Sequence, residues 1–279
     1  MLLGLVHKRM KNIFSHIRNA WARRRLMREF PARFAGKGSR TADVAVILHL
    51  FYFDLWQDIR HYLANIPVEF DLYVSVPPRF APDVVRDLLR SYPQAMLKVC
   101  ANRGRDIAPF IHFLTEICDY RYTAACKIHS KKSLHLADGR GWKADNGESW
   151  RNQLYEELLG STLLVKRILA AFDQDDRLGM VGPAGSLLNY LDVVGDNREN
   201  VQELMRRLRI DQEDFSFFAG SMFWFRPAAL AALAHLKIQL KDYAPEKGQV
   251  DGTLAHAIER VLAEVVRRNG MNVRSSSDL

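Results

Sequence analysis

From residue 43 onward, short apolar runs alternate with segments of helical periodicity, and this alternation constrains the fold more than any other feature. The apolar runs predict strands, and they cover residues 44–53, 69–77, 95–100, 123–129 and 178–183. The segments between them predict helices at 55–66, 81–92 and 107–120 and one long helix at 149–172. This order predicts an α/β fold whose mostly parallel sheet is flanked by helices on both faces.

Beyond residue 190 the alternation loosens. The sequence predicts a helix at 198–209, an aromatic-rich strand at 214–230 that Pro227 closes, and a final helix that Gly270 ends. Ligands of α/β sheets bind outside the carboxyl ends of the strands. We therefore expect the polar segments that end three strands to line one rim, and these segments are residues 100–106, 127–133 and 180–185.

The segment Asn102-Arg103-Gly104-Arg105-Asp106 joins the third strand to a helix. Gly104 permits a positive backbone φ, and Asp106 is placed to cap the helix that follows. Two arginines at a helix N-terminus also favour an anion. An ordinary strand–turn–helix junction and an anion-binding turn both fit this segment.

The segment KIHSKKS carries the fourth strand into a loop. Lys127, His129 and Lys131 share one side of an extended chain, since alternate residues face alike, and Lys132 carries charge into the loop. A solvated run of charges would have the same composition. These charges, however, follow an internal strand at the predicted rim, where a diphosphate would suit them. The long polar loop at 134–150 could fold over such a ligand.

Two later segments offer further candidates. The Gly220–Ser221 step allows close backbone approach, and Trp224 beside it could stack on a sugar or base, although a simple core strand also fits. Asp251 precedes the final helix, either as its N-cap or as an acidic group of a site. His256 falls on the side of that helix opposite its apolar stripe, so it faces solvent or a cleft.

Several function classes are excluded by missing motifs. The chain has no GxGxxG, GxxxxGK[ST], GxSxG or HExxH, which removes the standard dinucleotide, P-loop, hydrolase and zincin readings. Its three cysteines, Cys100, Cys118 and Cys126, and the lack of a CxxC predict reduced thiols in a cytoplasmic protein. No apolar run approaches the ~20 residues that cross a bilayer.

The net charge of +8 is concentrated at the N-terminus. Residues 1–40 hold 11 of the 40 Lys and Arg but one of the 32 Asp and Glu, so the remainder is slightly acidic, which argues against nucleic-acid binding. Residues 1–30 show a basic amphipathic helical pattern, which fits peripheral contact with an anionic membrane surface or docking on protein. Residues 35–40 resemble a linker, so we expect an N-terminal extension at 1–40 and a domain at 41–279.

Five segments together resemble the rhamnan synthesis protein F family of bacterial polysaccharide synthesis, over about residues 43–270. They are ANRGRDIAPF, KIHSKKS, GMVGP, FFAGSMFWFRP and EKGQVDGTLAHAIER. The resemblance implies a rhamnosyltransferase-like role in making O-antigen or a related lipopolysaccharide glycan. The order of elements is also similar to that of inverting glycosyltransferases with a GT-A fold, which are Rossmann-like. In that superfamily the acidic residue opening the last helix, here Asp251, is the general base.

Such enzymes usually present Asp-x-Asp after the fourth strand, where it holds a divalent metal against the nucleotide diphosphate. This chain presents His-Ser-Lys-Lys instead. We therefore expect Lys131 and Lys132 to replace the metal and stabilise the leaving diphosphate, together with Arg103 or Arg105. His129 would form a hydrogen bond beside them.

The sequence thus predicts an inverting rhamnosyltransferase that uses dTDP-rhamnose without a metal, although a divalent cation stays compatible with it. Trp224 or Trp142 would form part of the wall around the sugar. A lipid-linked glycan would be the acceptor, at the inner face of the cell membrane. The alternative is a non-catalytic module that binds glycans or nucleotide sugars for the polysaccharide assembly machinery.

Overall fold

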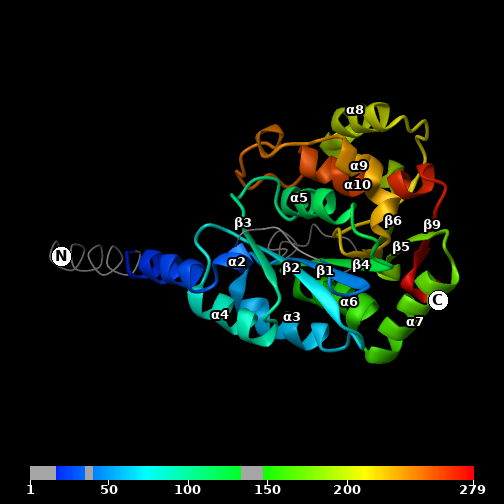
Figure 1. The fold of residues 1–279 in the computed structure, drawn as a ribbon. Helices are drawn as coiled ribbons and strands as arrows, with labels where there is room; N and C mark the ends of the chain where they lie inside the picture. Colours follow the sequence, from blue (N-terminus) through cyan, green and yellow to red (C-terminus); the bar gives the residue numbers. More distant parts are fainter. Residues whose placement is uncertain (1–16, 35–39, 133–146) are drawn as a thin grey trace.

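A computed structural model describes residues 17–34, 40–132 and 147–279. Its centre is a seven-stranded sheet in the order β3-β2-β1-β4-β8-β5-β9 (Figure 1). The strands are β1 (Val44–His49), β2 (Phe70–Val76), β3 (Met96–Val99), β4 (Ala124–His129), β5 (Leu178–Gly182), β8 (Phe223–Phe225) and β9 (Asn272–Ser275). All neighbours pair in parallel except β8, which runs antiparallel to β4 and β5. The predicted α/β fold with a mostly parallel sheet is confirmed.

Helices cover both faces of the sheet (Figure 1). The upper layer in this view contains α5 (Ile107–Ile117), α8 (Arg198–Leu208), α9 (Ala231–His235) and α10 (Leu254–Arg268). The lower layer contains α3 (Trp56–Leu63), α4 (Pro82–Ser91), α6 (Gly147–Leu159) and α7 (Thr162–Gln174), and the short α2 (Pro31–Phe34) precedes β1. Each layer encloses its own buried apolar cluster against the sheet.

Strand side chains divide between these two clusters because successive residues point to opposite faces. In β1, Ile47 joins the cluster under α5 and α10, whereas Leu48 joins the cluster over α3 and α6. In β4 the same alternation turns Lys127 and His129 toward α5, where both approach the same carboxylate. The two-residue period therefore places this charged pair on one side of the sheet.

The single long helix predicted at 149–172 is wrong, because α6 and α7 are separate helices that meet at Gly160 and Ser161. Ser161 has extended backbone, and its side-chain oxygen accepts a hydrogen bond from the Leu164 amide at 3.2 Å. This is a helix N-cap, which begins a new helix. Apolar residues recur at helical spacing on both sides of the break, so periodicity alone does not reveal it.

The aromatic-rich strand predicted at 214–230 is also two strands. β7 (Ser216–Phe218) pairs with β6 (Leu187–Asn189) in a separate two-stranded sheet, whereas β8 enters the main sheet. The chain turns between them at Gly220 and Ser221. Pro227 follows β8 as predicted and begins a short 3₁₀ helix. The C-terminal strand β9 was not predicted.

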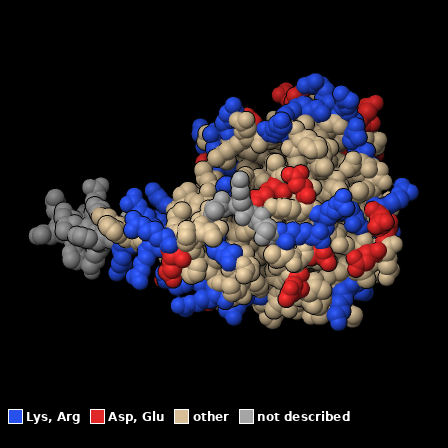
Figure 2. Space-filling view, in the orientation of Figure 1, with Lys and Arg blue, Asp and Glu red and all other residues tan. Residues whose placement is uncertain are grey.

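Residues 17–29 are helical and project from the body of the molecule (Figure 1). Lys and Arg gather on this projection, whereas charges of both signs intersperse over the rest of the face shown in Figure 2. Residues 1–16 lie outside the described part, so the amphipathic character of the whole segment and the domain boundary at 40–41 stay predictions. Within the described part, no helix is long and apolar enough to span a membrane.

Candidate functional site

A buried ion pair lies where the end of β4 meets the loop before α5 and the turn before β8. The Lys127 ammonium, 1% exposed, donates to Asp106 Oδ2 at 2.6 Å and to the Ser221 carbonyl at 2.5 Å. Ser221 Oγ donates to the same Asp106 oxygen at 2.7 Å. A buried charge is tolerated only when it is paired and hydrogen-bonded, and these contacts meet that requirement. Lys127 therefore ties three segments together rather than presenting its charge to a ligand.

Asp106 does not cap α5, contrary to the prediction. It precedes the helix, but its side chain makes no capping hydrogen bond and turns toward Lys127. Burial alone would raise the pKa of this carboxyl. The neighbouring Lys127 ammonium and the hydrogen bonds from Lys127 and Ser221 instead hold the pKa well below its usual value. Asp106 is an ionised anchor of the site at neutral pH.

Two buried histidines line the same edge of the sheet. His129 Nδ1 lies 3.5 Å from Asp106 Oδ2 without a hydrogen-bond partner among the described residues, and His49 Nδ1 lies 2.8 Å from Ser75 Oγ. Burial lowers the pKa of His129 well below its usual value and the pKa of His49 to about 4. Both imidazoles are therefore neutral at pH 7.

Two turns with unusual backbone conformations converge on Asp106. Gly104 and Arg105 have φ of 67° and 54°, and Gly220 and Ser221 have φ of 92° and 48°. Positive φ is costly for a non-glycine residue, and such conformations cluster at functional sites. The sequence predicted the conformation of Gly104. Ser221 in the second turn donates to Asp106, which directly follows the first turn in the chain.

Gly104 is also required for packing. A Cβ at this position would lie 2.4 Å from Tyr243 Cδ1 and 2.8 Å from the Ala108 Cβ, so any side chain would collide. Beside this turn, Arg103 forms a backbone bridge with Pro245, and Asn102 is exposed. The structure thus brings Arg103 and Asn102 to the rim without giving either a contact to the Lys127 ion pair.

Arg105 holds the loop before α10 against the rim. Its guanidinium lies 2.9 Å from His256 Nε2 and 3.4 Å from Glu246 Oε2, and it also donates to the Gln249 carbonyl. His256 is buried rather than solvated, and its Nδ1 lies 2.8 Å from Thr253 Oγ1. Burial, helped by Arg105, lowers the pKa of His256 to about 4. Of the two positions predicted for His256, the inward-facing one is observed.

Asp251 is neither the N-cap of α10 nor a free carboxylate. Thr253 caps the helix. The Asp251 oxygens accept hydrogen bonds from the Asn197 side chain, from the Asp196 amide at 3.2 Å and from Arg260 at 3.1 Å. This carboxylate therefore fastens the 3₁₀ helix η5 (Gly195–Asn197) to α10. All three donors belong to the protein.

The two adjacent lysines at the end of β4 diverge, contrary to their predicted joint grip. Lys132 pairs with Asp54 and lies 5.3 Å from the Tyr52 ring centre. Lys131 instead lies 4.3 Å from the ring centre of Trp150 and makes no ion pair with a carboxylate in the described residues. Burial lowers the pKa of Lys131. Of the two, Lys131 is the one left available to a ligand.

The predicted aromatic wall is partly wrong. Trp224 is fully buried on the face of the sheet opposite Lys127, and its Nε1 donates to the Leu158 carbonyl at 3.1 Å. Trp142 lies outside the described residues. Trp150, half-buried in the first turns of α6, was missed, although its place just after the loop that follows β4 was a usable signal. Glu259, one turn after His256 on α10, was missed as well.

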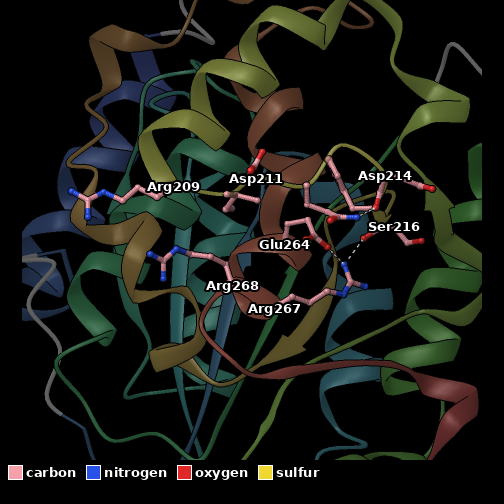
Figure 3. A pocket seen from close by; sticks show the side chains of 10 residues that line it. Arg209, Asp211, Asp214, Ser216, Glu264, Arg267 and Arg268 are labelled. Carbon is pink, nitrogen blue, oxygen red and sulfur yellow. Dashed lines mark hydrogen bonds and ion pairs between the residues drawn. The ribbon is translucent and has the colours of Figure 1, made fainter.

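Two cavities lie outside this cluster. One of about 630 Å³ is lined by the segment that joins α8 to β7, by the start of β7 and by the far end of α10, where Arg267 pairs with Glu264 and donates to the Ser216 carbonyl (Figure 3). A second, also of about 630 Å³, lies between β3, α5 and residues 237–243. The described residues contain no cluster of three or more His, Cys, Asp or Glu placed to hold a metal, and metal independence stays a prediction.

Fold and site together define an α/β protein with a cationic group and two strained turns at the carboxyl ends of its parallel strands. The chain matches the family model described as rhamnan synthesis protein F over residues 6–271, and it belongs to this family. The description of this family refers to the synthesis of rhamnan.

Two curated relatives come from Xanthomonas campestris pv. campestris, strains B100 and ATCC 33913, and both are described as uncharacterized protein WxcX. Each is 32% identical over 233 residues, which is 83% of this chain. The chain spans 32% of the length of these relatives. The similarity therefore concerns one part of a longer protein.

Proposed function

We propose that this chain is a glycosyltransferase of surface-polysaccharide synthesis, such as O-antigen synthesis, that transfers rhamnose from dTDP-rhamnose with inversion. The observation that carries the proposal is the ammonium group of Lys131, at the carboxyl end of β4 and without a carboxylate partner among the described residues. Ligands of such sheets bind at this edge, and a cation there suits a nucleoside diphosphate. The order of elements along the chain, similar to that of GT-A enzymes, and membership of the family support the proposal.

In the proposed reaction an acceptor hydroxyl attacks the anomeric carbon, and the bond from that carbon to the diphosphate breaks. Negative charge develops on the departing diphosphate, and Lys131 would stabilise it. A positioned donor in such a role is worth ~3 kcal/mol. A diphosphate nearby would also favour the charged form of Lys131, against the burial that lowers its pKa.

The other charged residues take supporting roles in this proposal. The ion pair of Lys127 with Asp106 holds the strand end and both turns in place, and Arg105 holds the loop before α10. Lys132 no longer belongs to the clamp, because Asp54 engages it. The chemistry needs no metal cofactor, since a fixed ammonium group supplies the charge that a cation would supply.

A lipid-linked glycan acceptor would place the reaction at the cytoplasmic face of the membrane. Ile17 and Trp21 are exposed on the projecting helix, and Arg24, Arg25 and Arg28 lie nearby along it. Exposed apolar residues beside arginines suit the surface of an anionic bilayer. We propose peripheral contact through residues 1–30 on this basis.

The test measures dTDP-rhamnose binding by calorimetry and dTDP release with an acceptor, both with and without a chelator. We expect chelator-independent binding, and we expect Lys131→Met to weaken it about tenfold or more, whereas Lys132→Met has little effect. Binding without turnover for any glycan acceptor would favour the glycan- or nucleotide-sugar-binding module. Strict metal dependence, or unchanged binding in Lys131→Met, would overturn the proposal.

A further inference from the structure

A second group of residues lies around Lys131, and its members come from three different elements. Trp150 comes from α6, Gly220 from the turn before β8, and Glu259 from α10. The Lys131 ammonium lies 4.3 Å from the indole ring centre, and a Cβ on Gly220 would lie 3.4 Å from Trp150 Cζ2. The Gly220 amide in turn donates to Glu259 Oε1 at 2.6 Å. The group therefore forms one continuous cluster at the rim of the sheet.

Glu259 has a different environment from Asp251, the carboxylate that the sequence favoured. Glu259 Oε1 is held by the Gly220 amide, but no described residue donates to Oε2. Asp251 instead receives three hydrogen bonds from protein donors, one of them from Arg260. A general base needs an oxygen within reach of the proton that it removes. By this criterion Glu259 is available and Asp251 is occupied.

Lys131 and Glu259 belong to the same cluster, through Trp150 and Gly220, without forming an ion pair. Among the charges acting on Lys131, the Glu259 carboxylate has the strongest effect, yet no ion pair within 4.0 Å joins the two. A direct displacement needs a cation on the side of the leaving group and a base on the side of the attacking hydroxyl. A separated ammonium and carboxylate, with an aromatic ring beside the ammonium, fit that requirement.

We propose that Trp150, Lys131 and Glu259 form the sugar subsite, in which the sugar ring stacks on Trp150 and Glu259 accepts the proton of the acceptor hydroxyl. The inference rests on the proposed function. The acceptor oxygen forms the new bond to the anomeric carbon, its proton goes to Glu259 Oε2, and the electron pair of the broken bond leaves on the diphosphate. Binding of the diphosphate draws the Lys131 ammonium from the indole face and frees that face for the sugar.

Substitutions at three positions test the subsite, with dTDP-rhamnose as donor and n-octyl α-L-rhamnoside as acceptor probe. We expect Glu259→Gln to lower kcat by about 10²–10⁴-fold. The Kd for dTDP-rhamnose should stay within about threefold, because glutamine keeps an oxygen for the Gly220 amide. The acidic limb of the kcat–pH profile should disappear as well, which a purely structural role would not cause. Glu199→Gln, an exposed acid on α8, is the matched control.

Substitutions at the other two positions, Trp150 and Asp251, test the sugar wall and the rival base. Trp150→Ala should raise the Kd for dTDP-rhamnose about tenfold, and Trp150→Phe should restore most of the affinity. Asp251→Asn should keep kcat within about fivefold of the wild type while lowering the unfolding temperature. If the wild type neither binds dTDP-rhamnose nor releases dTDP, the proposed function itself fails. If the wild type turns over but Glu259→Gln remains active and Asp251→Asn does not, this inference alone is overturned.

Discussion

Lys127 and Lys131 lie four residues apart at the end of one strand, yet their surroundings are opposite. Lys127 is enclosed, with a carboxylate, a carbonyl and a hydroxyl as acceptors. Lys131 contacts the face of an aromatic ring and has no carboxylate partner in the described residues. A satisfied buried charge stabilises structure, whereas a cation left without an anion is prepared for a ligand. The comparison separates a residue that stabilises the rim, Lys127, from one that we propose binds the ligand, Lys131.

The largest effect should come from the framework lysine. Lys127→Met leaves the Asp106 carboxylate buried without its counter-charge, and breaking a buried pair in this way costs about 3–5 kcal/mol of unfolding free energy. Urea denaturation would measure the loss. Adding Asp106→Asn to this variant should recover part of it, because the buried charge is then removed. A loss of unfolding free energy below about 1 kcal/mol would contradict the structural role of Lys127.

Gly104 tests whether the turn beside the ion pair is as tightly packed as it is in the structure. Gly104→Ala should lower the unfolding free energy by about 2 kcal/mol or more, because it combines a positive φ with a collision against Tyr243. Gly248→Ala is the matched control, since Gly248 also has positive φ but no atom within 4 Å of the new Cβ. It should cost about 1 kcal/mol. Equal losses in the two variants would contradict the packing argument.

The buried histidines give the framework a pH dependence. His49 and His256 have pKa values lowered to about 4 in the folded protein, whereas the unfolded pKa is near 6.5. Between these values the unfolded chain binds protons that the folded chain does not. The stability is therefore full above pH 6.5 and falls as the pH drops toward 4, by about 1.4 kcal/mol per pH unit for each histidine.

Denaturation at several pH values checks this slope. His49→Gln should flatten it, because one of the titrating groups is removed, while His235→Gln, at an exposed position on α9, should leave it unchanged. A stability that rises on acidification through the same range would refute the assignment of neutral buried imidazoles.

The smallest effect should come from Lys132. Its pair with Asp54 is open to solvent, with 31% and 62% of the two side chains exposed. Exposed ion pairs contribute about 0–1 kcal/mol, so Lys132→Met should change the unfolding free energy by less than about 1 kcal/mol. Asp54→Asn should also change the unfolding free energy by less than about 1 kcal/mol. If Lys132→Met lowered the unfolding free energy as much as Lys127→Met, the exposed and buried ion pairs could not be distinguished by their contribution to stability.

The strands of the fold could be predicted because buried strands of a parallel sheet are short apolar runs. The break at Ser161 could not, since an N-cap interrupts a helix without interrupting its apolar period. The final strand β9 is short and half-exposed, so it carried no apolar signal.

For the site, the two-residue period correctly put Lys127 and His129 on one side of β4. The same rule applied to β8 would have excluded Trp224, since Phe223 and Phe225 pack against α5 and Trp224 must face away. The prediction failed there because the turn at Gly220 divides what looked like one strand. The sequence did not show that the Asp251 carboxylate is engaged, because one partner, Asn197, lies 54 residues away and the other, Arg260, is two turns into α10.

The sequence by itself determined the α/β class, the polar rim at the carboxyl ends of the strands and the positive φ that Gly104 permits, because these follow from local periodicity and backbone sterics. Only the tertiary structure decided which lysine is buried, which carboxylate is occupied and which tryptophan reaches the rim. Those outcomes depend on hydrogen bonds and contacts between segments that are distant in the chain, and local sequence does not encode which segments will meet.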